Sequence, residues 1–219
     1  MVSKPSRKQP QQARSKATVT AVLDAMIRIL DREGSDAATT TRVAEVAGIS
    51  IGTLYQYFSH RDAILDALQD REFERAMALV QGVLGRAREQ GLAEDIAREV
   101  IRGLLSLYAE APGLHRVLAV EGLRVTPAHR VHAFDMRVIG VIRHFLSESR
   151  DPIRRRNLDA AAFVVFQSVR AAMLARMLES PPGVDDEALT EELTDMVLRY
   201  LVDERASARR VTNRRRARA

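Results

Sequence analysis

The stretch that decides the fold is residues 39–61, TTTRVAEVAGISIGTLYQYFSHR. Gly48 divides it into two segments with helical spacing of apolar residues, one at about 41–47 and one from Ser50 to about Phe58. Two short helices joined by a glycine-containing turn of three or four residues form a helix-turn-helix unit. The side chains that can form the small core between these helices are Val43, Ala47, Ile49, Leu54 and Phe58.

The second of these helices has two different faces. A helix advances about 100° per residue, which turns Leu54 and Phe58 inward. The outward face has an unusual composition for a structural helix, because a glycine in a helix interior costs about 1 kcal/mol relative to alanine. A glycine there also lets the backbone approach a partner closely. The outward residues are Ile51, Gly52, Tyr55 and Gln56.

Hydroxyl groups near this face favour contact with nucleic acid. Thr53, Tyr55 and Tyr57 carry them, and hydroxyls are among the usual contacts to DNA phosphates. Ile51 has no polar atom, so a base contact from its side chain would be apolar, with a thymine methyl group. The residues therefore predict a DNA-binding surface; the alternative is a helix pair with a structural role alone.

The motif resembles the signature of the TetR (tetracycline-repressor-type) family of bacterial transcriptional regulators. The similar residues are Gly48-Ile49-Ser50, Gly52-Thr53-Leu54-Tyr55, Tyr57-Phe58 and Arg61-Asp62, within a match over about residues 14–74. The resemblance implies that Thr40 and Thr41 contact DNA at the start of the first helix of the motif. It also implies base-facing positions at Ser50, Ile51, Gly52 and Tyr55, and phosphate contacts from Thr53, Gln56, Tyr57 and Arg61.

The rest of the chain also has helical periodicity, without a convincing period-two strand. We expect about nine helices in an all-α fold: a three-helix DNA-binding domain, then a helical ligand-binding and dimerisation bundle. A first helix is expected over about residues 16–32. The spacing of Ser59 and Asp62 predicts a capping box that opens a long fourth helix to about Gly85. Helix starts are expected at Pro112, Thr126-Pro127 and Asp151-Pro152, and a last helix at about 186–205.

Charge divides the chain into an acidic body and two basic ends. The net charge is +5, yet residues 1–16 and 205–219 are strongly basic. We assign residues 1–13 to a flexible basic arm, 14–74 to the DNA-binding domain, 75–205 to the bundle and 206–219 to a disordered basic tail. Basic ends of this kind commonly meet nucleic acid, and the alternative is that both are merely solvated.

Residues 160–166 are apolar at seven consecutive positions. A helix that is apolar on all sides must be buried on all sides, which favours a second subunit as a cover. The last helix adds apolar residues at helical spacing, so we expect a homodimer with two helices from each subunit; the alternative is a monomer with a buried central helix. The expected interface residues are Ala161, Ala162, Val165, Val169, Leu193, Val197 and Tyr200.

A pocket for a small apolar or amphipathic effector is expected in the bundle, although its apolar residues also suit an ordinary core. The candidate ligand-binding residues are Tyr108, His115, Glu121, Phe163, Gln167 and Arg170. The spacing of His129, His132 and His144 suits a divalent metal only weakly, so we expect neither metal nor cofactor. No catalytic motif appears, and we expect no enzyme activity.

The predicted function is a cytoplasmic regulator that binds a palindromic operator in double-stranded DNA, a repressor released by its effector. The chain contains no cysteine, which fits a reducing compartment. We expect no signal peptide and no membrane association, because no apolar run approaches the about 20 residues that a span requires. The alternative is a DNA-organising protein of the same fold that acts without an effector.

Overall fold

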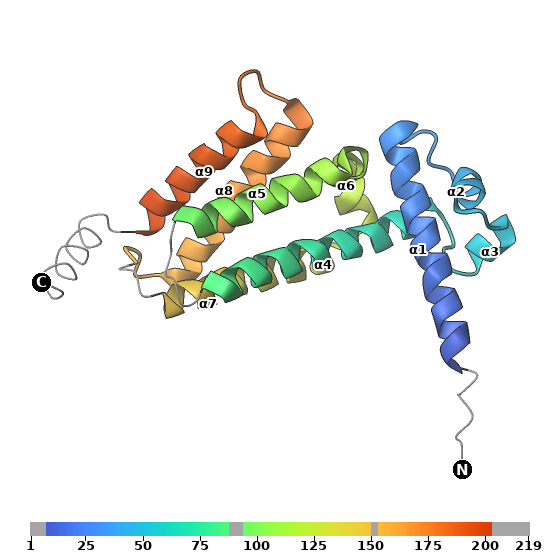
Figure 1. Cartoon of the computed structure of the whole chain (residues 1–219), viewed down its shortest axis with the longest axis horizontal. Coiled ribbons are helices and arrows are strands. Elements are labelled where there is room, and N and C mark those ends of the chain that lie inside the picture. The colour runs from blue at the N-terminus through green and yellow to red at the C-terminus, as the bar shows by residue number, and fades with distance from the viewer. Residues whose placement is uncertain (1–7, 88–93, 150–152, 203–219) are drawn as a thin grey trace, which may run out of the picture. The chain divides into compact units, whose positions relative to one another are not determined.

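The computed structural model describes residues 8–87, 94–149 and 153–202, and these form nine α-helices with no strand (Figure 1). The chain divides into two compact units, Met1–Glu72 with Ala111–Pro127, and Phe73–Glu110 with Ala128–Ala219. Helix α4 contributes residues to both. The expected all-α fold with an N-terminal helix-turn-helix is confirmed.

The first unit contains α1 (Lys8–Arg32), α2 (Thr40–Ala47), α3 (Ile51–Tyr55), the start of α4 (Arg61–Ala87) and α6 (Pro112–Val125). Helix α1 packs against both α2 and α6. Helix α1 begins at Lys8, so residues 8–13 of the predicted arm are helical. Residues 1–7 of that predicted arm lie outside the described residues. The core includes the fully buried side chains of Met26, Leu54 and Leu114.

Helix α6 belongs to the first unit, whereas the sequence placed it in the ligand-binding bundle. Its N-terminal residue is proline, as expected, and the carboxylate of Asp31 in α1 accepts hydrogen bonds from the backbone N–H groups of Gly113 and Leu114 at 2.7 and 3.4 Å. A Cβ atom at Gly113 would lie 2.5 Å from the Leu30 carbonyl oxygen, so only glycine permits this approach. The sequence could not show a contact 82 residues apart.

Helix α4 starts with a cap that differs from the predicted one. The backbone N–H of Ala63 donates to Nδ1 of His60 at 3.1 Å, so His60, and not Ser59, caps the helix. Helix α3 is also shorter than expected, because the chain leaves the helix at Tyr55 and continues to Phe58 as a turn.

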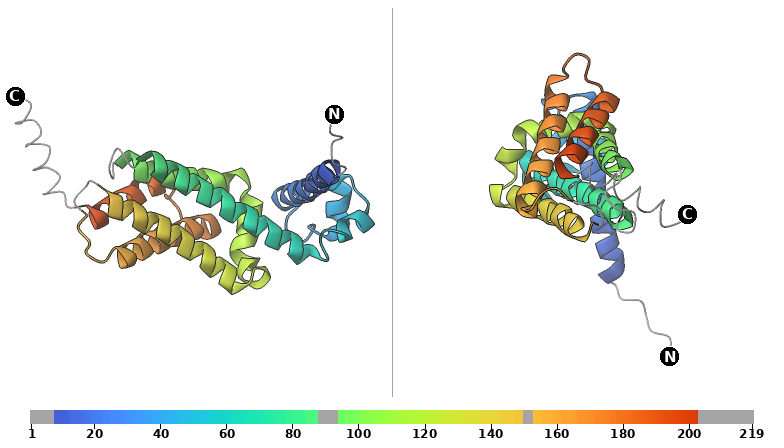
Figure 2. Two further views of the ribbon diagram at one scale, coloured as in Figure 1. Left: turned by 90° about the horizontal axis from the view of Figure 1, so that it is seen from below. Right: turned by 90° about the vertical axis from the view of Figure 1, so that its left-hand side faces the viewer.

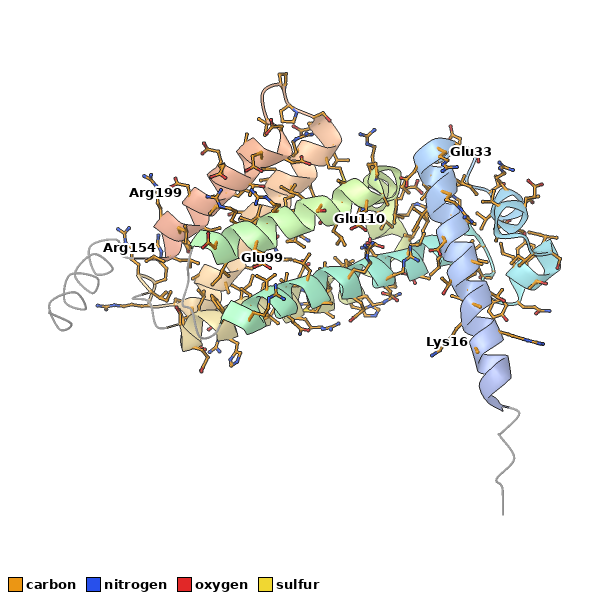
Figure 3. The ribbon with its side chains drawn as sticks, in the orientation of Figure 1. Lys16, Glu33, Glu99, Glu110, Arg154 and Arg199 are labelled. Carbon is orange, nitrogen blue, oxygen red and sulfur yellow. The ribbon has the colours of Figure 1, made fainter. Side chains whose placement is uncertain are left out.

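The second unit contains the remainder of α4 with α5 (Glu94–Glu110), α7 (Ala128–Glu148), α8 (Leu158–Glu179) and α9 (Asp186–Leu201). Helix α5 packs against α9, and α7 packs against α8; the views in Figures 1 and 2 show both pairs. Glu99 and Glu110, near the two ends of α5 (Figure 3), pair with Arg86 and Arg75 of α4. Helices α4 and α5 are therefore antiparallel.

Two predicted helix bounds in the second unit were wrong. Helix α8 begins at Leu158, where the side chain of Asn157 accepts a hydrogen bond from the Ala160 backbone N–H, and not at Pro152. Helix α9 ends at Leu201. The predicted tail, 206–219, lies outside the described residues.

Candidate nucleic-acid interface and ligand cavity

Helices α2 and α3 are each opened by a hydroxyl side chain. The Thr39 hydroxyl accepts a hydrogen bond from the Arg42 backbone N–H at 3.2 Å, and the Ser50 hydroxyl accepts one from the Thr53 N–H at 3.0 Å. Gly48 ends α2 in the left-handed conformation, with φ of 70°, which glycine adopts without strain. These caps fix the turn and, with it, the direction of α3.

The two faces of α3 lie as its spacing predicts. Leu54 and Phe58 are buried in the core of the first unit. Ile51 and Tyr55 are 39% and 52% exposed, although large apolar side chains are usually covered. The other predicted DNA contacts that the structure leaves exposed are Thr41, Ser50, Gly52, Gln56 and Tyr57.

A hydrogen bond joins the first helix of the motif to the second. The Thr40 and Tyr55 hydroxyl oxygens lie 3.2 Å apart, and the Ser50 and Thr53 hydroxyl oxygens lie 2.8 Å apart. Thr40 and Thr53 are half-buried. The structure thus brings residues from α2 and α3 together on one polar, hydroxyl-rich surface whose apolar members are Ile51 and the tyrosine rings.

Arg61, which the resemblance implied as a phosphate contact, forms an ion pair within the first unit. Its guanidinium donates to the Glu121 carboxylate at 2.9 and 3.3 Å and to the Ser35 hydroxyl at 2.8 Å. The side chain is only 25% exposed. Arg61 therefore ties the start of α4 to α6 and to the loop before α2.

The carboxylates around Arg61 are held in their charged form. Hydrogen bonds from Arg61 lower the pKa of Glu121 to about 2, against a smaller opposing effect of burial, and Arg124 adds a further hydrogen bond. Arg124 also donates to Asp62 at 2.8 and 3.2 Å and lowers the pKa of that carboxyl. Two ion pairs thus connect α4 with α6.

The second unit encloses a cavity of about 150 Å³, lined by α4, α5, α7, α8 and α9. All but two of its lining residues are apolar, and the exceptions are Tyr108 on α5 and Arg170 on α8. Both were predicted as ligand-binding residues. An apolar cavity with a few polar groups is the usual form of a small-molecule site.

The other four predicted ligand residues do not line this cavity. His115 and Glu121 lie in the first unit on α6, where His115 is buried with its Nε2 3.5 Å from a Glu72 carboxylate oxygen. Phe163 is 52% exposed on α8. Gln167 supports the site indirectly, because its side-chain oxygen accepts a hydrogen bond from Arg170 at 2.7 Å.

Asp135, which no pattern in the sequence indicated, pairs with Arg170. Its carboxylate oxygens lie 3.2 and 3.3 Å from Nη1 of Arg170, and burial raises the pKa of this carboxyl, partly offset by the charges of Arg170 and His132. The contact spans 35 residues and two helices, so no local pattern in the sequence marked it. Among the described residues, no group of three or more His, Asp or Glu could hold a metal ion.

Within a single chain, four of the seven predicted interface residues are buried and three are half-buried. Ala161, Ala162, Leu193 and Val197 are buried in the core of the second unit. Val165 and Val169 line the cavity, and the Tyr200 ring packs against the Arg155 guanidinium at 4.0 Å. Helix α8 is apolar on all sides, so periodicity could not tell its inner face from its outer one.

The outer face of α8 is a separate apolar stripe, which we call the α8 stripe. Its exposed members are Ala160, Phe163, Val164, Ala171 and Leu178. By length and composition alone, residues 158–179 could also cross a membrane, with 22% of that window buried, although apolar helices of soluble proteins pass the same test.

Two family models match the chain. Residues 22–68 match "Bacterial regulatory proteins, tetR family", and residues 93–201 match "Tetracyclin repressor-like, C-terminal domain". The chain belongs to the TetR family. The first match covers the helix-turn-helix and the second covers α5 to α9, so the residues of α4 that line the cavity lie outside both matches.

Three proteins illustrate what this TetR-family chain is similar to. An uncharacterised HTH-type transcriptional regulator from the dhlA 5' region of Xanthobacter autotrophicus is 24% identical over 84% of this chain and 91% of its own length. Nucleoid occlusion factor SlmA of Glaesserella parasuis is 27% identical over 47% of this chain, and the match spans about half of that relative. The solved structure of fatty acid degradation regulator FadR from Bacillus halodurans has a TM-score of 0.64 at 17% identity, covering 83% of this chain and 94% of that one.

TetR-family proteins are DNA-binding transcriptional regulators and not enzymes, and they bind ligands and act as dimers. The helix-turn-helix that the sequence predicted is therefore part of the DNA-binding domain of a TetR-family regulator.

Proposed function

We propose that this TetR-family protein is a cytoplasmic homodimeric repressor that binds a palindromic operator through α2 and α3 and leaves it when a small effector occupies the cavity. The observation that carries the proposal is the exposed outer face of α3, with Ile51 and Tyr55 uncovered while Leu54 is fully buried. A helix of this kind fits the major groove, where side chains contact base edges.

The α8 stripe supports the dimer. Phe163 and Val164 are 52% and 40% exposed, and Met196 on α9 is 39% exposed. We assign the α8 stripe to a second copy of the chain and not to a membrane, because the inner face of α8 packs in the core of the second unit and TetR-family proteins act as dimers. A two-fold symmetric dimer presents two equal reading helices, which requires two equal half-sites in the DNA.

The cavity supports control by an effector. Its lining residues outside α4 lie in the part of the chain that matches the repressor-like C-terminal domain, and its walls suit an apolar or amphipathic molecule. An effector releases DNA only when it binds the released state more tightly than the DNA-bound state.

The test is selection of bound sequences from random DNA at about 150 mM salt, because affinity depends strongly on salt. The expected result is a palindrome or near-palindrome with half-sites about one helical turn or a multiple apart. Tyr55→Ala should abolish the enrichment, while Met136→Ala, at an equally exposed residue of the second unit, should not. Recovery of asymmetric sites alone would count against a symmetric dimer.

A second candidate function is DNA organisation without an effector, which the similarity to a nucleoid occlusion factor favours. In that case residues 206–219, which carry six arginines, would bind DNA phosphates. Their deletion would then flatten the salt dependence of DNA binding by about 0.9 per lost phosphate contact in a log–log plot. The repressor proposal expects the slope at the selected site to stay unchanged.

A further inference from the structure

The cavity in the second unit has one polar end and one apolar end. Tyr108 lies two residues before Glu110, which pairs with Arg75 of α4. Asp135, the partner of Arg170, lies two residues before Arg137, which pairs with Glu74 of α4 at 2.8 Å. The two ion pairs bring these polar groups to the same stretch of α4. At the other end, where Arg86 pairs with Glu99, the lining residues are apolar.

The guanidinium of Arg170 has donors left over. Nη1 donates to both oxygens of Asp135, and Nη2 donates to Gln167 at 2.7 Å. Arginine has five N–H donors, and among the described residues its Nε makes no hydrogen bond. The guanidinium also lies 5.3 Å from the centre of the Phe166 ring, which borders the cavity. A ligand in the cavity can therefore accept a hydrogen bond from Arg170.

The charge of Arg170 is already balanced. Asp135 is 14% exposed and lies within 3.3 Å of the guanidinium. A ligand carboxylate would make two anions share one cation. Arg170 itself is 37% exposed, so solvent screens part of the repulsion, but the largely buried Asp135 would face the second anion across the guanidinium, which is costly. A neutral acceptor, such as a ketone, ester or amide oxygen, takes a spare donor without displacing Asp135.

We infer that the cavity takes a neutral amphiphile, whose apolar body lies among the side chains of α5, α7 and α8 and whose hydrogen-bond acceptor meets Arg170, at the end of the cavity that Tyr108 also lines. This inference rests on the proposed effector role of the cavity. The volume of about 150 Å³ suits a body about the size of a six-membered carbon ring, since an apolar cavity of about that volume holds benzene.

Three matched probes test the inference: cyclohexane, cyclohexanone and cyclohexanecarboxylate. Binding is followed by NMR of methionine methyl groups, because Met173 lines the cavity and is 2% exposed, while Met136 and Met196 are exposed and serve as internal controls. Purely apolar walls favour cyclohexane, since a ketone loses its hydrogen bonds to water on entry. The inference predicts that cyclohexanone shifts the Met173 signal and binds about three- to tenfold more tightly than cyclohexane.

Two variants separate the roles of the polar groups. Asp135→Asn removes the competing anion and should raise the affinity for the carboxylate by about tenfold or more. The double change Arg170→Leu with Asp135→Leu removes both charges and should return the preference to cyclohexane. Helix content by circular dichroism checks folding, and the wild-type preference decides the question if a variant does not fold.

Cyclohexane bound more tightly than the ketone by wild type, no gain of carboxylate affinity in folded Asp135→Asn, or no Met173 shift with any probe would overturn the inference. Release of selected DNA is measured separately with the same probes. Ketone binding without DNA release would contradict the effector part of the proposed function and leave the inference standing.

Discussion

Nη1 of Arg61 lies 2.9 Å from Oε2 of Glu121, 60 residues away in the chain, and Nη2 lies 3.3 Å from Oε1. The pair joins the first residue of α4 to α6. A second pair joins the same helices with the charges exchanged, because its cation, Arg124, lies on α6 and its anion, Asp62, lies on α4. The start of α4 follows directly on the DNA-binding motif, so these pairs fix the end of the motif within the first unit.

We predict that Arg61→Ala weakens DNA binding without changing its salt dependence. The loss of contacts to Glu121 and Ser35 should lower the free energy of unfolding by about 1–3 kcal/mol. A lost phosphate contact would flatten the log–log salt slope by about 0.9 per subunit, whereas a positioning residue leaves the slope unchanged. Affinity measured between 50 and 200 mM salt distinguishes the two roles, and Arg124→Ala, in the same cluster, should behave alike.

Lowering the pH should destabilise the first unit, because Glu121 becomes protonated and its ion pair with Arg61 is lost. Its pKa is about 2 in the folded protein and about 4.5 when unperturbed, so its stabilising effect is complete above about pH 4.5 and is lost as the pH falls towards 2. Glu121→Gln should remove at most about 3 kcal/mol of this pH-dependent stability, and less with solvent screening. The difference between the free energies of unfolding in urea at about pH 5.5 and about pH 3 measures this pH-dependent stability. Glu192→Gln on α9 should keep the wild-type difference between the two pH values.

Phe163→Glu should convert the dimer into a folded monomer. The side chain is 52% exposed in a single chain, so the charge is tolerated there but is costly when a second subunit covers it. Met136→Glu changes an equally exposed residue on α7 and should leave the dimer intact. Light scattering at micromolar concentration measures both. A Phe163→Glu protein that remains a dimer would place the interface elsewhere.

The same substitution at Ala162, the buried neighbour of Phe163, should have a different effect. Ala162→Glu introduces an unpaired charge into the core of the second unit and should unfold it, which circular dichroism detects. The two substitutions lie one residue apart, so their different outcomes test the assignment of inner and outer faces of α8.

The exposed residues of α3 and of the turn after it should divide into base and phosphate contacts. Tyr57→Phe removes a hydroxyl and should weaken binding to specific and non-specific DNA alike. Ile51→Ala should change the preference at one base pair, because an apolar contact to a thymine methyl group distinguishes bases. Dissociation constants for a set of single-base variants of the selected site measure both effects. Equal loss at every position after the Ile51 change would mean that Ile51 packs and does not contact a base.

Local patterns predicted the helix-turn-helix well, because the turn at Gly48 and the inward positions of Leu54 and Phe58 depend on residues only a few positions apart. The cap of α4 and the end of α3 were local errors, whereas the other errors concern contacts between distant residues. The roles of Arg61 and Glu121 depend on each other across 60 residues, and the place of α6 depends on Asp31.

In the second unit, too, contacts between residues far apart in the sequence could not be predicted. The residues that line its cavity come from five helices, and Arg170 was predicted without its partner Asp135. The inner face of α8 could not be told from the outer one, because apolar side chains surround that helix and only its packing against α7 and α9 distinguishes them. The sequence indicated Ser59 as the cap of α4, because serine is a common cap and Ser59 has the usual spacing to Asp62. In the structure the cap is His60, a residue type rarely found there.

The most direct test of sequence-specific regulation is the ratio of dissociation constants for non-specific DNA and for the selected operator at about 150 mM salt. We predict a ratio of about 10³ or more, with two subunits bound per operator, and a ratio that falls towards one in Tyr55→Ala. A ratio near one for the wild-type protein would contradict the account.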